Sequence, residues 1–165
     1  MRRKFDLLRF IPAVVWMYVI YRLSDKPATE STAQSETLTL RLVRFFAPLT
    51  DMDSSGQREA AMLLEPYVRE AAHAAEYAIL FIAVVIAVSA FISDDLKASL
   101  ISICICFLYS CTDEWHQLHV QGRSAELVDI LLDTAGAFIA MIIYNIWRRH
   151  LKGRRKAVHT EQSDE

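Results

Sequence analysis

The sequence has little of what marks a soluble or a nucleic-acid-binding protein. Glycine and proline are scarce, with four of each in 165 residues, whereas 53% of the residues are hydrophobic and the mean hydropathy is positive. This composition fits one domain and excludes an ordinary soluble protein. The net charge of -2 leaves no basic excess, so no nucleic-acid partner is expected.

Cysteine is also sparse and lacks a functional spacing. Cys104, Cys106 and Cys111 lie inside or at the end of one apolar run, without the spacing of a zinc or thioredoxin motif, so we interpret them as free thiols. The segment from Asp51 to Gly56 imitates the start of a calcium loop, but Met62 stands where the bidentate Glu is required. We therefore expect neither a metal nor a cofactor.

Apolar stretches predict an all-α, polytopic membrane protein with four transmembrane helices. The stretches cover residues 7–23, 71–93, 96–115 and 127–147. Runs of this kind are typical of membrane-spanning helices. Pro12 and the interfacial Trp16 favour an uncleaved anchor over a signal peptide for the first stretch. We expect a four-helix domain over residues 1–150 and a disordered cytoplasmic tail over residues 151–165.

Residues 24–70 are predicted to form the first outer loop. The stretch from Ser24 to Thr37 is polar and rich in Ser and Thr, and we interpret it as irregular. From residue 38 to 49 hydrophobic side chains recur at helical spacing, which predicts a short amphipathic helix on the membrane or over the bundle. A second short helix is expected to begin after the Ser54-Ser55 pair and to stop before Pro66.

Basic residues indicate the orientation. If both termini face the cytoplasm, eleven of the 18 Lys and Arg residues lie on the cytoplasmic side, in residues 1–9, 94–97 and 148–156. The other seven are spread over much longer outer segments. The positive-inside rule therefore predicts that the N-terminus and the C-terminus both lie inside the cell.

Acidic residues of three spans are expected at one level of the membrane. A helix rises about 1.5 Å per residue, so counting from the cytoplasmic ends places these acids roughly 21 to 27 Å up, at the outer edge of the hydrocarbon core. They are Glu76, Asp113, Glu114, Asp129 and Asp133. Five acids cannot all stay ionised cheaply there, so at least one is expected to hold a proton near neutral pH. This is the condition for general acid/base chemistry.

The same region resembles a known family. The resemblance rests on Arg69–Tyr77, on Ser110–Glu114 with Gln117, on Gly122-Arg123 and on Asp129 with Asp133–Gly136, together with Ser24. They resemble the VanZ-like family of small bacterial integral membrane proteins, whose members have about four spans and whose founding member is associated with teicoplanin resistance. The resemblance implies a bacterial cytoplasmic membrane protein. Two positions depart from it, since Glu70 replaces a usual basic residue and Ala74 a usual aromatic one.

The resemblance and the helical spacing together indicate the candidate site. The predicted catalytic residues are His73, Glu76, Asp113 and Glu114. The predicted substrate-binding residues are Arg69, Gln117, Arg123, Asp129 and Asp133. The expected ligand is a membrane lipid or another amphiphile, such as a lipid-linked cell-wall precursor or a lipoglycopeptide. Binding of this kind would connect the protein with glycopeptide (teicoplanin-type) antibiotic resistance.

Other interpretations remain open, including whether the protein is an enzyme. An intramembrane enzyme would use His73 or a protonated acid as the base, with a partner acid completing a transfer on a lipid-linked cell-envelope substrate. Proton-coupled transport by a four-helix chain would require a homo-oligomer. In a purely structural interpretation, Arg69 or Arg123 neutralises the acids so that the helix ends pack, and no ligand binds.

Overall fold

A computed structural model describes residues 7–161, with side chains described through residue 154. Every secondary-structure element in this range is helical, which confirms the all-α class for the described part of the chain. The elements are η1 (Leu8–Phe10), α2 (Ile11–Ser24), α3 (Ala28–Phe46), η2 (Ala47–Leu49), α4 (Ser54–Val88), α5 (Asp95–Gln117) and α6 (Leu127–Glu161).

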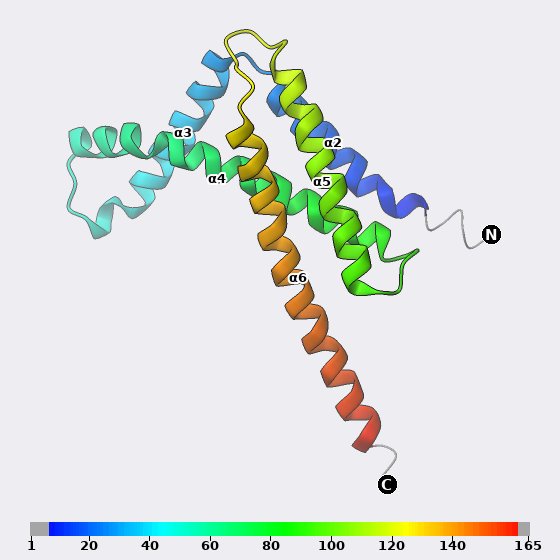
Figure 1. The fold of residues 1–165 in the computed structure, drawn as a ribbon. Coiled ribbons are helices and arrows are strands. Elements are labelled where there is room, and N and C mark those ends of the chain that lie inside the picture. Colours follow the sequence, from blue (N-terminus) through cyan, green and yellow to red (C-terminus); the bar gives the residue numbers. More distant parts are fainter. Residues whose placement is uncertain (1–6, 162–165) are drawn as a thin grey trace.

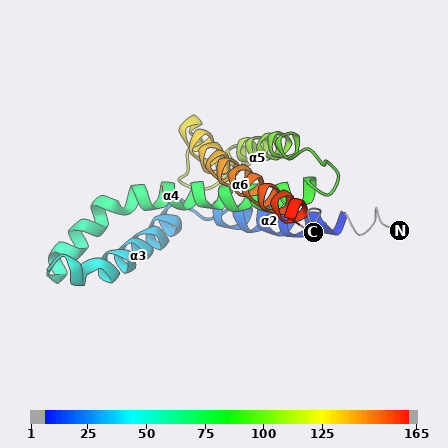
Figure 2. The same cartoon turned by 90° about the horizontal axis from the view of Figure 1, so that it is seen from below.

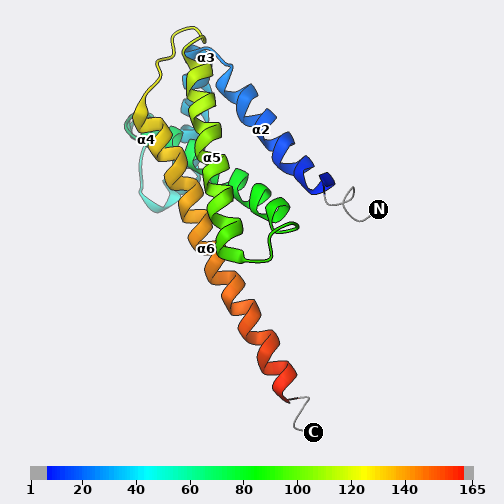
Figure 3. The ribbon, with the colours of Figure 1, turned by 45° about the vertical axis from the view of Figure 1, so that its right-hand side comes forward.

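Helix α4 is the centre of a helical bundle. It contacts α2, α5 and α6, and α5 also contacts α2 and α6. Helices α2, α4, α5 and α6 alternate in direction, so that the start of α2 and the end of α6 lie toward the same end of the bundle (Figure 1). The 118–126 loop and the α2–α3 connection meet at the other end (Figure 3). There the Ala28 N–H donates to the Gln121 carbonyl at 3.1 Å.

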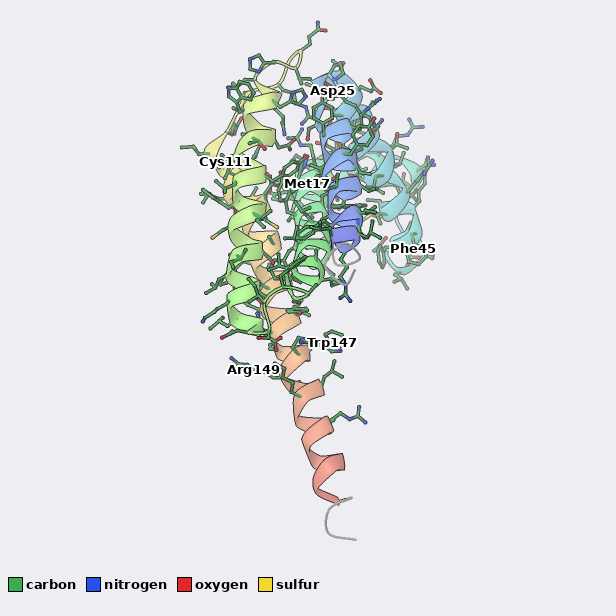
Figure 4. All side chains as sticks on the ribbon, turned by 90° about the vertical axis from the view of Figure 1, so that its right-hand side faces the viewer. Met17, Asp25, Phe45, Cys111, Trp147 and Arg149 are labelled. Carbon is green, nitrogen blue, oxygen red and sulfur yellow. The ribbon has the colours of Figure 1, made fainter. Side chains whose placement is uncertain are left out.

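Helix α3 and the first part of α4 form an arm beside the bundle. The two segments contact each other and extend away from α2, α5 and α6 (Figure 2). The arm exposes apolar side chains, including Phe45, Leu49 and Met62. In the view of Figure 4, Phe45 lies beside the bundle and below the level of Asp25. The hydrophobic stretch 38–49 therefore belongs to an arm that extends outward and does not cover the end of the bundle.

The predicted irregular stretch from Ser24 to Thr37 is wrong, because α3 already begins at Ala28. Glu30 lies in its first turn, where a carboxylate interacts favourably with the helix dipole. The hydroxyl of Thr37 donates to the Ala33 carbonyl one turn back, at 2.8 Å. Hydroxyls bonded in this way leave the backbone ladder intact, so a Ser/Thr-rich composition does not exclude a helix.

The predicted stop before Pro66 is also wrong, because α4 continues through this proline. A proline inside a helix removes one backbone hydrogen bond and bends the helix, and α4 is bent (Figure 2). Helix α3 stabilises the segment, since Ser35 donates to the buried carboxylate of Glu65. The predicted span 71–93 is thus the later part of one long helix that ends at Val88.

Three helices are long and apolar enough to cross a membrane, namely α4, α5 and residues 127–154 of α6. The first predicted span, residues 7–23, coincides with η1 and α2, but α2 has only 14 residues. At 1.5 Å per residue this is about 21 Å, less than a hydrocarbon core of about 30 Å. A total of four spans therefore stays a prediction.

Helix α6 continues to Glu161, although the sequence predicts a disordered tail from residue 151. The prediction is wrong for residues 151–161, and residues 162–165 lie outside the described range. The Asp95 carboxylate of α5 anchors this part of α6, because Arg148 Nη2 and Lys152 Nζ lie 2.8 Å and 2.5 Å from its oxygens. Lys and Arg are also good helix formers.

One glycine permits the packing of α6 against α4. The fully buried Tyr77, Leu80 and Phe81 place α4 in the core. A Cβ added to Gly136 of α6 would lie 2.0 Å from the carbonyl oxygen of Ala74. The two backbones therefore touch at Gly136, and any larger residue would force them apart.

We expect Gly136→Ala to lower the melting temperature of the purified protein, because the added methyl group meets helix backbone. Overpacking of this kind costs about 1–3 kcal/mol. The matched control is Gly153→Ala on the same helix, where nothing lies within 4 Å of the new Cβ. There alanine should be neutral or should stabilise by up to about 1 kcal/mol. Equal melting temperatures for the two variants would contradict this account of the packing.

Candidate functional site

The inner face of α5 carries a polar stripe that leads to the loop end of the bundle. Its buried residues recur at spacings of three and four, as on one face of a helix. They are Ser99, Ser102, Cys106, Ser110, Asp113 and Gln117. Asp113 and Gln117 lie in the last turns, together with the adjacent Glu114, and all three are at most 6% exposed. These buried polar groups require hydrogen-bond partners from neighbouring segments.

A chain of hydrogen bonds joins α2, α5 and the 118–126 loop. Ser24 Oγ donates to Asp113 Oδ2 at 2.8 Å, and Gln117 Nε2 donates weakly to the same oxygen at 3.4 Å. Arg123 then donates through Nη1 to Gln117 Oε1 at 2.8 Å. Its Nε donates to the Lys26 carbonyl at 3.2 Å. The guanidinium of Arg123 is therefore held in place by neutral acceptors.

The other buried acids are bound in a similar way. Ser110 Oγ donates to Asp133 Oδ2 at 2.8 Å, which joins α5 to α6. The backbone N–H of Glu126 donates to Glu114 Oε1 at 2.7 Å, just before the first turn of α6. Asp133 is 5% exposed and Glu114 is 4% exposed. Both carboxylates thus connect α5 to the start of α6.

Helix α4 contributes the pair His73 and Glu76. The Nδ1 atom of His73 lies 3.7 Å from Oε2 of Glu76, a distance too long for a hydrogen bond. Glu76 Oε2 is buried and has no hydrogen-bond partner among the residues that the structure describes. Asp113 Oδ1 and the Tyr77 hydroxyl share this property. Unsatisfied buried polar atoms are unusual in native proteins and often mark functional sites.

A cavity of about 240 Å³ opens beside this network. Its walls come from the first turns of α3, from α4, from the end of α5, from the 122–126 loop and from the start of α6. The lining residues are Ala28, Ser31, Thr32, Arg69, Glu70, His73, Gln117, Gly122, Arg123, Ser124, Glu126, Val128, Asp129, Leu132 and Asp133. The cavity is therefore lined mainly by polar groups, although it lies at the end of apolar helices.

The structure brings most of the predicted site residues to this cavity. Those that line it are Arg69, His73, Gln117, Arg123, Asp129 and Asp133. Glu76, Asp113 and Glu114 do not line the cavity. Asp113 nevertheless bonds Gln117, which lines it. The five predicted substrate-binding residues all line the cavity, whereas His73 is the only predicted catalytic residue that does so.

The sequence did not indicate some residues of the site. Ser31 and Thr32 line the cavity from α3, but their stretch was interpreted as irregular, so no facing could be assigned. Glu126 adds a further carboxylate to the lining. Glu70, which the sequence marked as a departure from the family pattern, adds another. Asp25 lies outside the cavity and contacts His116 at 3.2 Å. If residues 28–46 had been interpreted as a helix, the spacing of four would have placed Thr32 one turn after Ala28 on the same helix face.

Burial shifts the pKa of Arg123 in the 118–126 loop. Burial lowers the pKa of the Arg123 guanidinium from its ordinary value, and the positive charge of Arg69 adds to this effect while Asp113 opposes it. Arginine stays charged at neutral pH despite such a shift. Within the described residues, no group of three or more His, Cys, Asp or Glu side chains is arranged to hold a metal ion.

Comparison with known proteins identifies the family of the chain. The chain matches the family model described as VanZ/LLP1 over residues 9–148, which includes α2, α4, α5, the first part of α6 and every predicted site residue. Searches of the curated proteins and of the solved structures give no match. The apolar helices are those of a membrane protein. The chain therefore belongs to the VanZ/LLP1 family.

Proposed function

We propose that the cavity binds the polar headgroup of an amphiphile that reaches it through the membrane. The amphiphile is a membrane lipid, a lipid-linked cell-wall precursor or a lipoglycopeptide. The observation that supports this most is the position of a polar cavity at the end of helices whose outer faces expose apolar side chains. Polar lining groups contact the headgroup, and the acyl or isoprenyl tail lies along the apolar outer surface of the bundle.

Arg123 and Gln117 are the central headgroup contacts in this proposal. Two nitrogens of the Arg123 guanidinium already donate to Lys26 and Gln117, so its orientation is set before a ligand binds. Its Nη2 atom has no protein acceptor within the described part of the chain, and it is free to donate to a ligand. A preorganised guanidinium loses little conformational entropy on binding, which favours affinity.

We place the protein in the bacterial cytoplasmic membrane with both termini inside and the cavity facing outward. In this topology α2, despite its length, is the first of four spans. Trp147 and Arg149 lie toward the end of the bundle opposite Asp25 (Figure 4). Aromatic and basic residues at one end of a bundle are typical of a cytoplasmic membrane interface.

Reporter fusions at two positions test this topology. We expect alkaline phosphatase inserted after Gln121 to be active, and a fluorescent protein fused after Glu165 to fluoresce, because the former folds outside the cytoplasm and the latter inside. As controls, the fluorescent protein is inserted after Gln121 and alkaline phosphatase is fused after Glu165. The level of each fusion protein is measured by immunoblot. Phosphatase activity after Glu165 would contradict the proposed orientation.

We further propose that headgroup binding contributes to resistance to teicoplanin-type lipoglycopeptides. Arg123→Ala should lower the inhibitory concentration of the drug to that of an empty vector in a susceptible host, because it removes the preset headgroup contact. Glu114→Gln should retain resistance, since a Gln oxygen can still accept from the Glu126 N–H. Arg58→Ala, on an exposed part of α4 outside the cavity, is the matched control.

The variants are compared at equal membrane levels and with their melting temperatures measured. Resistance that falls in proportion to melting temperature in every variant would favour the purely structural interpretation. Resistance that is unchanged by Arg123→Ala would contradict the binding proposal.

A second candidate function is intramembrane acid/base catalysis on a lipid-linked cell-envelope substrate. The observation that favours it is the position of His73. This residue lines the cavity, and its Nδ1 atom lies 3.7 Å from Oε2 of Glu76, which does not line the cavity. A carboxylate near an imidazole supports the charged form that results when the imidazole accepts a proton. The imidazole would accept the proton of an attacking hydroxyl group, and a partner acid would protonate the group that leaves the lipid-linked substrate.

Enzymatic activity predicts a product of changed mass when the purified protein is incubated with a lipid-linked cell-wall precursor in detergent. His73→Ala should abolish conversion while precursor binding and melting temperature are retained. His119→Ala, an exposed histidine outside the cavity, is the control. If mass spectrometry shows that the precursor binds but detects no product, this result would contradict enzymatic activity and would leave the binding function.

A further inference from the structure

Opposite charges lie in the cavity without pairing. Its lining contains the guanidiniums of Arg69 and Arg123, together with carboxylates. The carboxylates are Glu70, Glu126, Asp129 and Asp133. Within the described residues, no ion pair of 4.0 Å or less joins either of these arginines to a carboxylate. Arg123 bonds only neutral acceptors, and Arg69 has no hydrogen bond in the described part of the chain.

The separation of these charges has an energetic consequence. Charged groups that are removed from water are costly unless they are paired. Asp133 is 5% exposed, and the Ser110 hydroxyl, on Oδ2, is its only hydrogen-bond donor among the described residues. Arg123 and Asp129 are partly buried, whereas Arg69, Glu70 and Glu126 are exposed. The fold therefore holds cationic and anionic groups apart along one cavity, and the incomplete compensation concerns the buried carboxyl group of Asp133 above all. A ligand with both charges compensates the two groups at once, whereas a ligand with one charge leaves the other group unpaired.

The side chains indicate which chemical group meets each charge. A guanidinium presents a planar fork of donors that matches a phosphate. Arg69 and Arg123 both line the cavity, so an anion bound there can contact both guanidiniums and offsets the repulsion between their positive charges. Asp129 and Asp133 are four residues apart and lie on one face of α6. Carboxylates on one face accept hydrogen bonds from an ammonium group.

We infer that the ligand of this cavity has a zwitterionic headgroup, with its phosphate between Arg69 and Arg123 and its ammonium group against Asp129 and Asp133. The inference rests on the proposed headgroup binding and specifies the class of amphiphile. It selects phosphoethanolamine-type headgroups over anionic phosphoglycerol and over uncharged sugar headgroups.

Lipid binding to the detergent-purified full chain tests the inference. Native mass spectrometry compares phosphatidylethanolamine, phosphatidylglycerol and a diglucosyl diacylglycerol with the same acyl chains. We expect phosphatidylethanolamine to bind about tenfold more tightly than either, the value of one charge-assisted hydrogen bond. Free phosphoethanolamine, measured by thermal shift, separates recognition of the headgroup alone from recognition of a lipid.

Two charge-neutralising variants identify the partners. Asp129→Asn should reduce the affinity for phosphatidylethanolamine about tenfold and leave phosphatidylglycerol binding unchanged, because only the ammonium contact is lost. Arg69→Gln should weaken both phospholipids by a similar factor. The matched controls are Glu30→Gln on α3 and Arg58→Gln on α4, both exposed and outside the cavity.

The outcomes distinguish this inference from the proposed function. Equal affinity of the wild type for all three lipids, or tighter binding of phosphatidylglycerol, would overturn the zwitterionic assignment and leave amphiphile binding intact. An Asp129→Asn variant that loses both phospholipids equally at an unchanged melting temperature would also overturn it. Failure of the wild type to bind any of the lipids or lipid-linked precursors would instead remove the proposed function itself.

Discussion

The contact between Gly136 and the backbone of Ala74 is the constraint on which the site depends. Because α4 and α6 touch there, His73, which precedes Ala74, and Asp133, three residues before Gly136, come to the same place. Arg69 and Asp129 lie one turn farther from the contact on their respective helices, and both line the cavity. The cavity therefore lies just beyond the closest approach of these two helices.

Burial of carboxylates is the main cost of this arrangement. Small hydroxyl side chains from neighbouring helices offset part of it, since Ser24 donates to Asp113 and Ser110 donates to Asp133. The same bonds join α2 to α5 and α5 to α6, so the polar groups also specify how the helices pack. Glu76 and Asp113 each retain one buried oxygen without a partner in the described range 7–161. A fold selected for stability alone would avoid such atoms.

The arm joins the cavity to an exposed apolar surface. Its first helix, α3, contributes Ser31 and Thr32 to the cavity wall, and its far part exposes apolar side chains beside the bundle. The polar lining and the apolar surface are thus parts of one continuous segment. A molecule with a polar head and an apolar tail matches both surfaces, which a soluble polar ligand does not.

Local patterns in the sequence were sufficient for much of this protein. Hydropathy identified α4, α5 and α6 as apolar helices, and the helical spacing placed Asp129 and Asp133 on one face of α6. The helical state of residues 28–37 and the passage of α4 through Pro66 were not predictable in this way. Composition and proline are weak local signals that packing of α3 on α4 overrides, as the Ser35–Glu65 bond indicates.

By itself the sequence determined the helical class, the apolar helices and the identity of the polar residues, because periodicity and hydropathy are properties of neighbouring positions. Only the tertiary structure decided that Ser24 is the partner of Asp113, that Ser31 and Thr32 complete the cavity, and that its arginines and carboxylates stay apart. These features depend on how closely helices distant in sequence approach, and that distance is set by packing at residues such as Gly136.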